Sequence, residues 1–98
     1  MKTKQHQLRG LSAEQVLLIA DELCLRFPDR IRSFSALCAV AATSTARLHG
    51  VPVHQDPESQ AQSAYDAVIS LEPLVSRNDI LAATIKQTLL TLNADYLR

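Results

Sequence analysis

The side chains best suited to chemistry in this sequence gather in two short stretches. In the first, His49, His54 and Asp56 fall within eight residues and are potential ligands for a metal ion. Two histidines with four residues between them in a loop are a weak pattern for such a site, and no cysteine or glutamate lies among them. We therefore expect these three side chains to be exposed loop residues, and we predict no metal site and no cofactor.

The second stretch runs from Glu72 to Ile80 and reads Glu-Pro-Leu-Val-Ser-Arg-Asn-Asp-Ile. Glu72 and Asp79 are a potential pair of carboxylates for acid–base catalysis. The alternative, which we favour, is that each is a surface charge at a helix end. Serines occur along the chain, but no histidine is placed for them by a motif, so nucleophilic catalysis lacks support.

Helices must position both stretches, and the spacing of apolar residues predicts four of them. The first runs from about Ser12 to Arg26, with Ser12 and Gln15 arranged as a capping box. The second begins near Ser33, a good N-cap, and is expected to stop at His49–Gly50 because glycine commonly ends helices. Residues 51–55 are expected to be extended, owing to their β-branched residues and proline.

The third helix is predicted to begin at Asp56, an N-cap followed by Pro57 in the first turn. It should break at Glu72–Pro73, since the residue before a proline is pushed out of the helical conformation. The fourth starts at Ser76 or Asn78 and carries the longest apolar seam, formed by Leu81, Ile85, Thr88, Leu89 and Leu92. The prediction is an all-α, compact helical bundle spanning residues 11–98, preceded by a flexible basic tail over residues 1–10.

The stretch from residue 72 onward resembles a motif of the Fic/Doc family. In that family a helix ends in a motif of the form His-Pro-Phe/Leu-x-Asp/Glu-Gly-Asn-Lys/Gly-Arg, and a long apolar helix follows that commonly closes on Leu-Asn-Gly. Here Pro73, Leu74 and Asn78 stand at matching positions, with Leu92-Asn93 in register behind them. The resemblance covers about residues 11–97 and implies a Fic/Doc-like fold, truncated where Doc-like proteins continue into further helices.

Upstream segments agree with this resemblance. Leu11-Ser-Ala-Glu-Gln-Val16 resembles the opening of Doc-type proteins, and Phe34-Ser-Ala-Leu37 resembles their Phe-Gly-Leu-Leu segment. The family places near residues 48–57 a flap that presents a target peptide. By this resemblance, the flap would dock a peptide on Val51, Val53 and His54, with main-chain bonds giving affinity.

The positions that carry the family's chemistry are replaced in this chain. Glu72 stands where a histidine acts as general base, and a carboxylate is a weak base at neutral pH. Ser76 replaces the acidic residue that holds Mg²⁺. Arg77 replaces the glycine that allows the backbone N–H groups of the loop to surround the phosphates. Asp79 and Ile80 replace the Lys/Gly and the phosphate-binding arginine, and a carboxylate at a helix start repels an anion. These losses predict a domain without nucleotide transfer.

The composition, the net charge and the longest apolar run of the chain exclude further classes of function. Of 98 residues, 47% are hydrophobic, while ten basic and ten acidic residues cancel, so the electrostatic footprint of a nucleic-acid binder is missing. The longest apolar run, residues 36–42, is far shorter than the roughly 20 residues that span a bilayer. We expect a cytoplasmic protein that binds neither nucleic acid nor membrane. Cys24 and Cys38 lie in apolar helical patterns, where a buried thiol is the usual state.

From the sequence we predict a catalytically inactive Fic/Doc-like domain that acts as a protein-binding or toxin–antitoxin-related module. The partner would be an antitoxin-like protein or a target peptide, and self-association is left open. The alternative is a Fic/Doc-type transferase that moves AMP or phosphate from a nucleotide to a protein hydroxyl.

Overall fold

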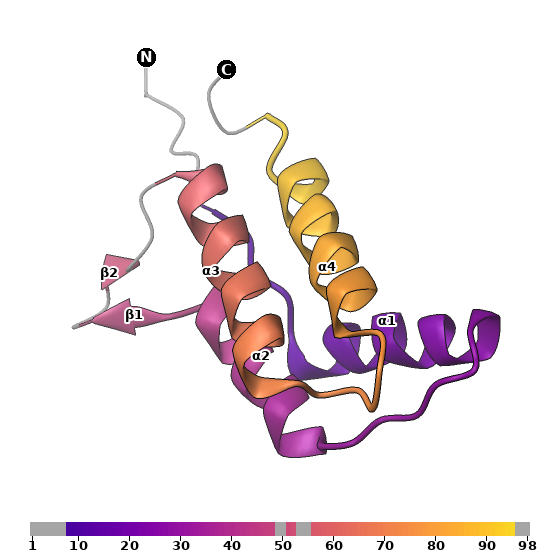
Figure 1. The fold of residues 1–98 in the computed structure, drawn as a ribbon. Helices are drawn as coiled ribbons and strands as arrows, with labels where there is room; N and C mark the ends of the chain where they lie inside the picture. The colour runs from indigo at the N-terminus through magenta and orange to yellow at the C-terminus, as the bar shows by residue number, and fades with distance from the viewer. Residues whose placement is uncertain (1–7, 49–50, 53–55, 96–98) are drawn as a thin grey trace, which may run out of the picture.

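The computed structural model describes residues 8–48, 51–52 and 56–95 of the chain. Four helices make up most of these residues, which confirms the predicted all-α class (Figure 1). They are α1 (Ala13–Arg26), α2 (Phe34–Ser44), α3 (Pro57–Leu71) and α4 (Asn78–Leu92). Between α2 and α3, two-residue strands β1 (Arg47–Leu48) and β2 (Val51–Pro52) pair antiparallel, with Leu48 opposite Val51.

Three helix starts follow the local capping signals. Ser12 accepts a hydrogen bond from the backbone N–H of Gln15, whose side chain accepts one from the backbone of Ser12, so the predicted capping box is formed. Ser33 caps α2, and Asp56 caps α3 with Pro57 at the first position. Side-chain oxygens satisfy N–H groups that a helix start leaves unpaired, so these boundaries depend on residues only three apart.

The end of α2 differs from the prediction. The helix stops at Ser44, five residues before His49–Gly50, and β1 begins at Arg47. Side-chain donors take up carbonyls at the end of the helix: Ser44 Oγ donates to Ala41 O at 2.8 Å, and Gln60 Nε2 of α3 donates to Ser44 O at 3.0 Å. Once these carbonyls bond to side chains, α2 no longer needs a glycine to terminate it.

Helix α4 begins at Asn78, one of its two predicted starts, but neither Ser76 nor Asn78, the two candidate caps, is its N-cap. The N-cap is Arg77, which makes no side-chain capping bond, whereas Asn78 is already the first helical residue. The predicted break after α3 is confirmed: Glu72 takes a left-handed conformation with φ of 50° and Pro73 follows.

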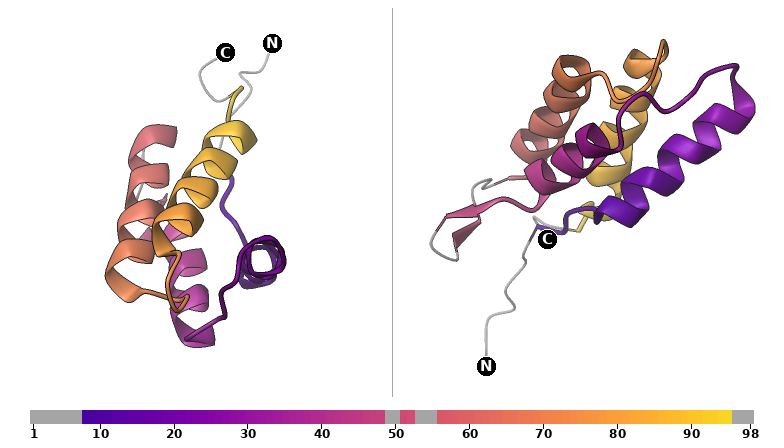
Figure 2. Two further views of the ribbon diagram at one scale, coloured as in Figure 1. Left: turned by 45° about the vertical axis from the view of Figure 1, so that its right-hand side comes forward. Right: turned by 90° about the horizontal axis from the view of Figure 1, so that it is seen from below.

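The helices enclose one apolar core, to which all four contribute (Figure 1). α3 and α4 lie side by side, α2 packs on α3, and α1 packs against α2 and α4, as the further views in Figure 2 also show. The predicted seam of α4 faces this core at Leu81, Ile85 and Leu89, which are fully buried. The core is made of these together with Leu11, Val16, Ala20, Leu37, Val40, Ala41, Ala61, Ala64, Val68, Leu74 and Ala82.

A buried polar network ties the chain before α1 to the end of α4. Arg9 donates its backbone N–H to Asn93 Oδ1 at 2.7 Å, and Asn93 Nδ2 donates to Arg9 O and to Gln60 Oε1. A Cβ on Gly10 would lie 2.7 Å from the backbone oxygen of Ser44, so only glycine fits there without a shift. Arg9 and Gly10, which we had assigned to the tail, are therefore packed against the helices, while residues 1–7 lie outside the described residues.

Candidate functional site

The turn between α3 and α4, residues 72–77, is held against the segment that connects α1 to α2. An isolated antiparallel bridge pairs Ile31 with Leu74. Beside it, the backbone N–H groups of residues 32 and 33 both donate to the carbonyl of Pro73, at 2.6 and 3.1 Å. The Pro-Leu pair of the motif is thus used as a short strand-like contact, and both of its residues are buried.

Glu72, which the resemblance aligns with a general base, closes helix α3. Its carbonyl and that of Leu71 accept hydrogen bonds from Arg32 Nε and Nη2, each at 2.6 Å. A guanidinium that binds the last carbonyls of a helix also complements the negative end of the helix dipole. The Glu72 side chain itself is exposed. Among the described residues no hydrogen bond or ion pair joins it to Asp79, so the predicted view of two separate helix-end charges fits this geometry.

Asn78, the best-kept polar residue of the motif, folds the turn. Its Oδ1 accepts from the backbone N–H of Leu74 at 2.8 Å and its Nδ2 donates to the Leu74 carbonyl at 2.9 Å. The amide group therefore uses its acceptor and a donor on one backbone residue. This asparagine has a structural task that requires no ligand.

The backbone N–H groups that lead into α4 already bind an anion, which is the carboxylate of Asp29. Ser76 N donates to Asp29 Oδ1 at 3.1 Å and Arg77 N donates to Asp29 Oδ2 at 2.8 Å. Burial raises the pKa of the Asp29 carboxyl, but the hydrogen bonds from the backbone of Arg30, Arg77 and Ser76 and from the Ser76 side chain outweigh it, so the pKa is lowered. The carboxylate sits where a phosphate would meet a helix N-terminus.

The remaining motif positions point to surface and packing roles. Arg77 places its guanidinium carbon 5.3 Å from the centre of the Phe27 ring, a cation–π distance. Its Nε is buried without a hydrogen-bond partner. Ser76 and Asp79 are exposed and Ile80 is half-buried. The turn therefore brings the motif residues together around Asp29 and the connecting segment, and not around an open cleft.

Of the other predicted residues, the structure describes Val51 and Asp56, and both lie apart from this turn. Asp56 accepts from Ser59 N at 2.7 Å as a helix cap, and within the described ranges no group of three His, Cys, Asp or Glu side chains is placed to hold a metal ion. His49, His54 and Val53 lie outside the described residues. Val51 belongs to β2, where it pairs with Leu48.

Asp29 and Arg32 were missed by sequence reasoning although they organise the turn. Both lie in the connecting segment Asp29-Arg-Ile-Arg32, directly after Pro28. The available signal was a dense run of charges in a short connection between two helices, where nearby orphan N–H and C=O groups need partners. The sequence does not say which helix end such charges will meet.

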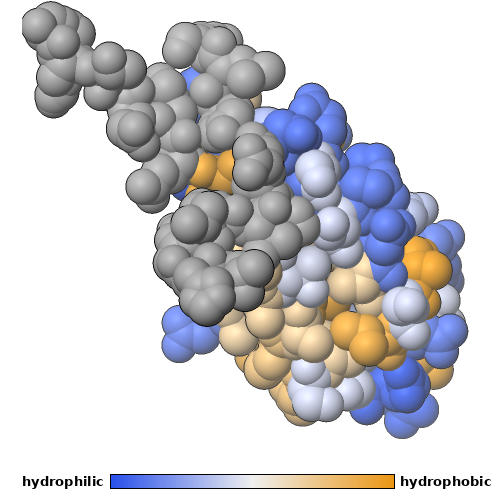
Figure 3. All heavy atoms as spheres, turned by 90° about the vertical axis from the view of Figure 1, so that its left-hand side faces the viewer, coloured by the Kyte–Doolittle hydropathy of each residue, from blue (hydrophilic) through white to orange (hydrophobic). Residues whose placement is uncertain are grey.

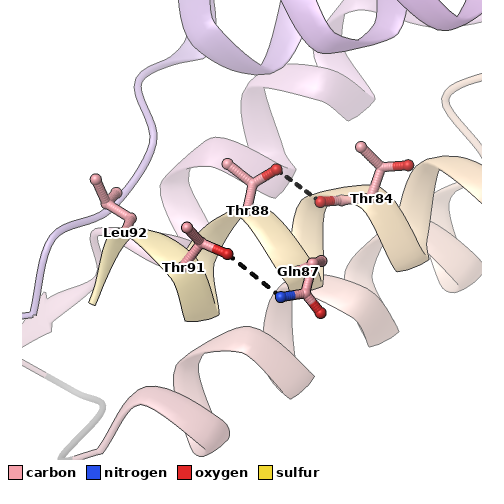
Figure 4. Close-up of a pocket in the computed structure, with 5 residues that line it drawn as sticks. All are labelled: Thr84, Gln87, Thr88, Thr91 and Leu92. Atoms are coloured by element: carbon pink, nitrogen blue, oxygen red, sulfur yellow. Dashed lines mark hydrogen bonds between the residues drawn. The ribbon is translucent and has the colours of Figure 1, made fainter. Parts of the chain in front are cut away.

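An open hollow of about 500 Å³ lies along α4 (Figure 4). Two of its three threonine hydroxyls turn back to the helix: Thr84 Oγ1 donates to Ile80 O at 2.8 Å, and Thr88 Oγ1 donates to Thr84 O at 2.7 Å. The third, Thr91 Oγ1, accepts from Gln87 Nε2 at 3.3 Å. Mostly carbon is therefore left on the surface of the hollow, which suits apolar contact better than chemistry. A second hollow of about 400 Å³ shares Thr84 and continues onto α1 at Ile19 and Leu23. The first is lined by Thr84, Gln87, Thr88, Thr91 and Leu92.

In comparisons with known proteins, no family model, no curated protein and no solved structure matches the chain. The resemblance to the Fic/Doc family therefore stays a prediction that rests on the residues of the turn and its flanking helices. Within the described ranges, none of the helices has both the length and the apolar character needed to cross a bilayer.

Proposed function

We propose that this chain is a non-catalytic protein-binding domain with a Fic/Doc-like fold. In this proposal the motif turn only holds α3 and α4 against the segment that connects α1 to α2. The observation that carries this proposal is the Asp29 carboxylate on the N–H groups of Ser76 and Arg77. By the resemblance, these amides belong to the loop that cups nucleotide phosphates. A phosphate would have to displace a carboxylate whose lowered pKa keeps it charged at neutral pH.

The surroundings of the turn support the same conclusion. Asp29 and Asp79 place two carboxylates near the start of α4, and a phosphate brought there would meet like charges at short range. The guanidinium of Arg77 contacts the Phe27 ring, and that of Arg32 bonds to the α3 carbonyls. Both guanidinium groups are thus already engaged by other groups of the fold.

Protein binding is proposed at the β1–β2 hairpin. Leu48 and Val51 form the pair nearest the hairpin tip, and a two-stranded ribbon keeps outer edges with unpaired backbone groups. An extended peptide adds to such an edge through main-chain hydrogen bonds, and neighbouring side chains select its sequence. This agrees with the target-peptide flap implied by the resemblance. A toxin–antitoxin partner is one kind of protein that such an edge would accept.

The nucleotide half of the proposal predicts no stabilisation of the protein by Mg²⁺-ATP. A ligand present at 100 times its dissociation constant adds about 2.7 kcal/mol to stability, which corresponds to a shift in Tm of roughly 10 °C or more for a domain of this size. Differential scanning fluorimetry with 1 mM Mg²⁺-ATP should show no such shift. ATP labelled at the α- or γ-phosphate should transfer no label to protein.

A rebuilt variant provides the positive control for that experiment. Asp29→Ala frees the two amides, and Ser76→Asp, Arg77→Gly, Asp79→Lys and Ile80→Arg restore the family's residues. If the fold is of the Fic/Doc type, this five-fold variant should gain measurable ATP affinity. Tight ATP binding or label transfer by the unmodified protein would instead support the alternative, a transferase.

The binding half predicts that the hairpin carries affinity for a protein partner. The double variant Val51→Ser, Val53→Ser should weaken binding of a co-purifying partner by about tenfold, or 1.4 kcal/mol. Val51 lies in β2 and neither valine belongs to an apolar helical stripe of the sequence, so circular dichroism should be unchanged. Val75→Ser is the matched control, since Val75 is an exposed valine in the turn after α3. Full affinity in the double variant would show that the hairpin is not the docking site.

A further inference from the structure

Helix α1 turns two large leucine side chains outward. Leu18 is 67% exposed and Leu25 is 82% exposed, whereas the opposite side of the helix is buried at Val16 and Ala20. The two leucines are seven residues apart, which is about two helical turns, so they lie in one row along the outer surface of α1. Single exposed leucines need no explanation, but a row of them beside an apolar hollow marks a contact surface.

The hollow beside this row lies in the corner between α1 and α4 (Figure 1). Its α1 part is lined by Leu18 itself together with Ile19 and Leu23, and Thr84 joins that part to the hollow along α4. No charged residue lines the α4 part, so the charges of this surface come from α1. Amphipathic helices bind such hollows with apolar side chains at positions i, i+3, i+4 and i+7.

Acidic side chains flank the leucine row. Three exposed acids lie three or four residues from Leu18 and therefore on the same surface of the helix, namely Glu14, Asp21 and Glu22. Within the described part of the chain, the carboxylates of Glu14 and Asp21 make no hydrogen bond or ion pair. Glu22 pairs with Arg26 at 3.4 Å, but both side chains are more than half exposed, so the pair contributes little and opens readily.

We propose that this surface of α1 and α4, made of Leu18, Leu25 and the adjoining hollow, docks a basic amphipathic helix of another protein. Apolar side chains of that helix cover the leucines and fill the hollow, while its Lys or Arg side chains meet the three carboxylates of α1. The apolar contact supplies affinity, and the charges select the partner and speed its approach. The β1–β2 hairpin lies on the other side of the molecule (Figures 1 and 2), so the inference does not depend on the hairpin or on the Fic/Doc resemblance.

The sign of the charge distinguishes this partner from two other occupants. The surface carries three carboxylates against the single base Arg26, a net charge of −2. A second copy would bring the same charges, and two-fold pairing would set carboxylates against carboxylates. A membrane surface is itself anionic and binds helices whose polar side carries Lys or Arg, so it would repel α1.

The other apolar surface of the molecule lacks this selectivity. Figure 3 shows apolar colours on the side of α2, in the lower half of the view. No charged residue occurs from Ser33 to Ala46, however, so the exposed side of α2 offers no charge for a partner to complement. The α1 surface alone combines exposed leucines, a hollow and charges of one predominant sign.

The test uses two synthetic peptides that differ only in charge. Each has 14 residues, the length of α1, with leucines at i, i+3, i+4 and i+7 and with either lysine or glutamate on the other side. In ¹⁵N NMR titrations of the full chain, the lysine peptide should shift the amide signals of α1 and Thr84 with a dissociation constant of about 0.1 mM. The glutamate peptide should bind at least about tenfold more weakly. Salt should weaken the lysine peptide several-fold, because exposed charges are screened.

Two double variants test the leucines and the acids separately. Leu18→Ala, Leu25→Ala should weaken the lysine peptide about tenfold or more and keep the helix, because both leucines are exposed and alanine favours helix. Leu71→Ala, at an exposed leucine at the end of α3, is the matched control and should bind normally. Asp21→Lys, Glu22→Lys should lose the lysine peptide and bind the glutamate peptide instead, a reversal that simple destabilisation would not produce.

Several results would overturn the inference. They are equal affinity for the two peptides, signal shifts centred on α2 or the hairpin, and no shift up to about 1 mM peptide. A second copy as the occupant would appear as shifts of α1 signals that grow with the concentration of the protein alone. A membrane as the occupant would appear as co-sedimentation with phosphatidylglycerol vesicles that Leu18→Ala, Leu25→Ala abolishes. All these measurements are independent of nucleotide binding and of the Val51→Ser, Val53→Ser experiment.

Discussion

Replacing Asn93 with alanine is expected to lower the free energy of unfolding by about 3 kcal/mol. The side chain is 3% exposed and joins the end of α4 to Arg9, 84 positions earlier, and to Gln60 in α3. Its loss leaves the N–H of Arg9 and the Oε1 of Gln60 without this partner in the interior, and each buried unsatisfied group costs about 1–3 kcal/mol. At roughly 4–8 °C per kcal/mol for a domain of this size, Tm should fall by more than 10 °C.

Urea unfolding followed by circular dichroism measures this loss, and Gln62→Ala is the matched control. Gln62 also bonds through its amide, to Asp66 and Lys86, but on the exposed side of α3. Its removal should change stability by about 0.5 kcal/mol or less, because water replaces the lost partners. A loss below about 1 kcal/mol for Asn93→Ala would mean that the network adds little to the fold. Hydrogen exchange should show the backbone N–H of Arg9 becoming unprotected in the variant.

Replacing Asp29 with asparagine is expected to cost about 1–2 kcal/mol at pH 7, in the range of a lost helix cap. The carboxylate accepts hydrogen bonds from the N–H groups of Ser76 and Arg77 ahead of α4, which has no side-chain cap of its own. The amide keeps the shape but turns one acceptor into a donor that faces an N–H group. Asp79→Asn is the control, since Asp79 lies in the first turn of the same helix and has no bond to these amides. It should cost only a few tenths of a kcal/mol.

The pH dependence of the stability difference between wild type and Asp29→Asn distinguishes a charged cap from a packing contact. The pKa of Asp29 is lowered in the folded protein from its ordinary value of 3.8. Its contribution to stability is therefore complete above that ordinary value and is lost as pH falls through the folded pKa. The stability gap between wild type and Asp29→Asn should be constant from pH 7 to about pH 5 and shrink from about pH 4 downward. A gap that persists undiminished at pH 2 would contradict the assignment of a charged cap.

Some features of this protein follow from signals that act over three or four residues. The capping side chains of Ser12, Ser33 and Asp56 bond to N–H groups three positions ahead, so the starts of α1, α2 and α3 could be read along the chain. The apolar period near 3.6 likewise predicted the helical class and the buried seam of α4.

The end of α2, which was predicted wrongly, depends on partners distant in sequence. α2 stops at Ser44 because its last carbonyls meet Gln60 and the hydroxyl of Ser44 itself, which also bonds to Leu11. A glycine signal at residue 50 could not reveal that the helix would be closed by α3. Helix termination here is a tertiary contact, and such contacts have no local pattern.

The motif turn shows most clearly which features the sequence determines and which depend on the tertiary structure. The sequence by itself determined that this turn lacks the histidine, acidic residue and arginine of the motif that it resembles, since those are identities at fixed positions. Only the tertiary structure decided what the turn does in their place. Asp29 lies 47 residues before Ser76 and Arg32 lies 40 before Glu72, so their pairing with the turn depends on how α1, α2 and α3 pack. Backbone N–H and C=O groups at helix ends must find partners, but which side chain reaches them is set by the fold.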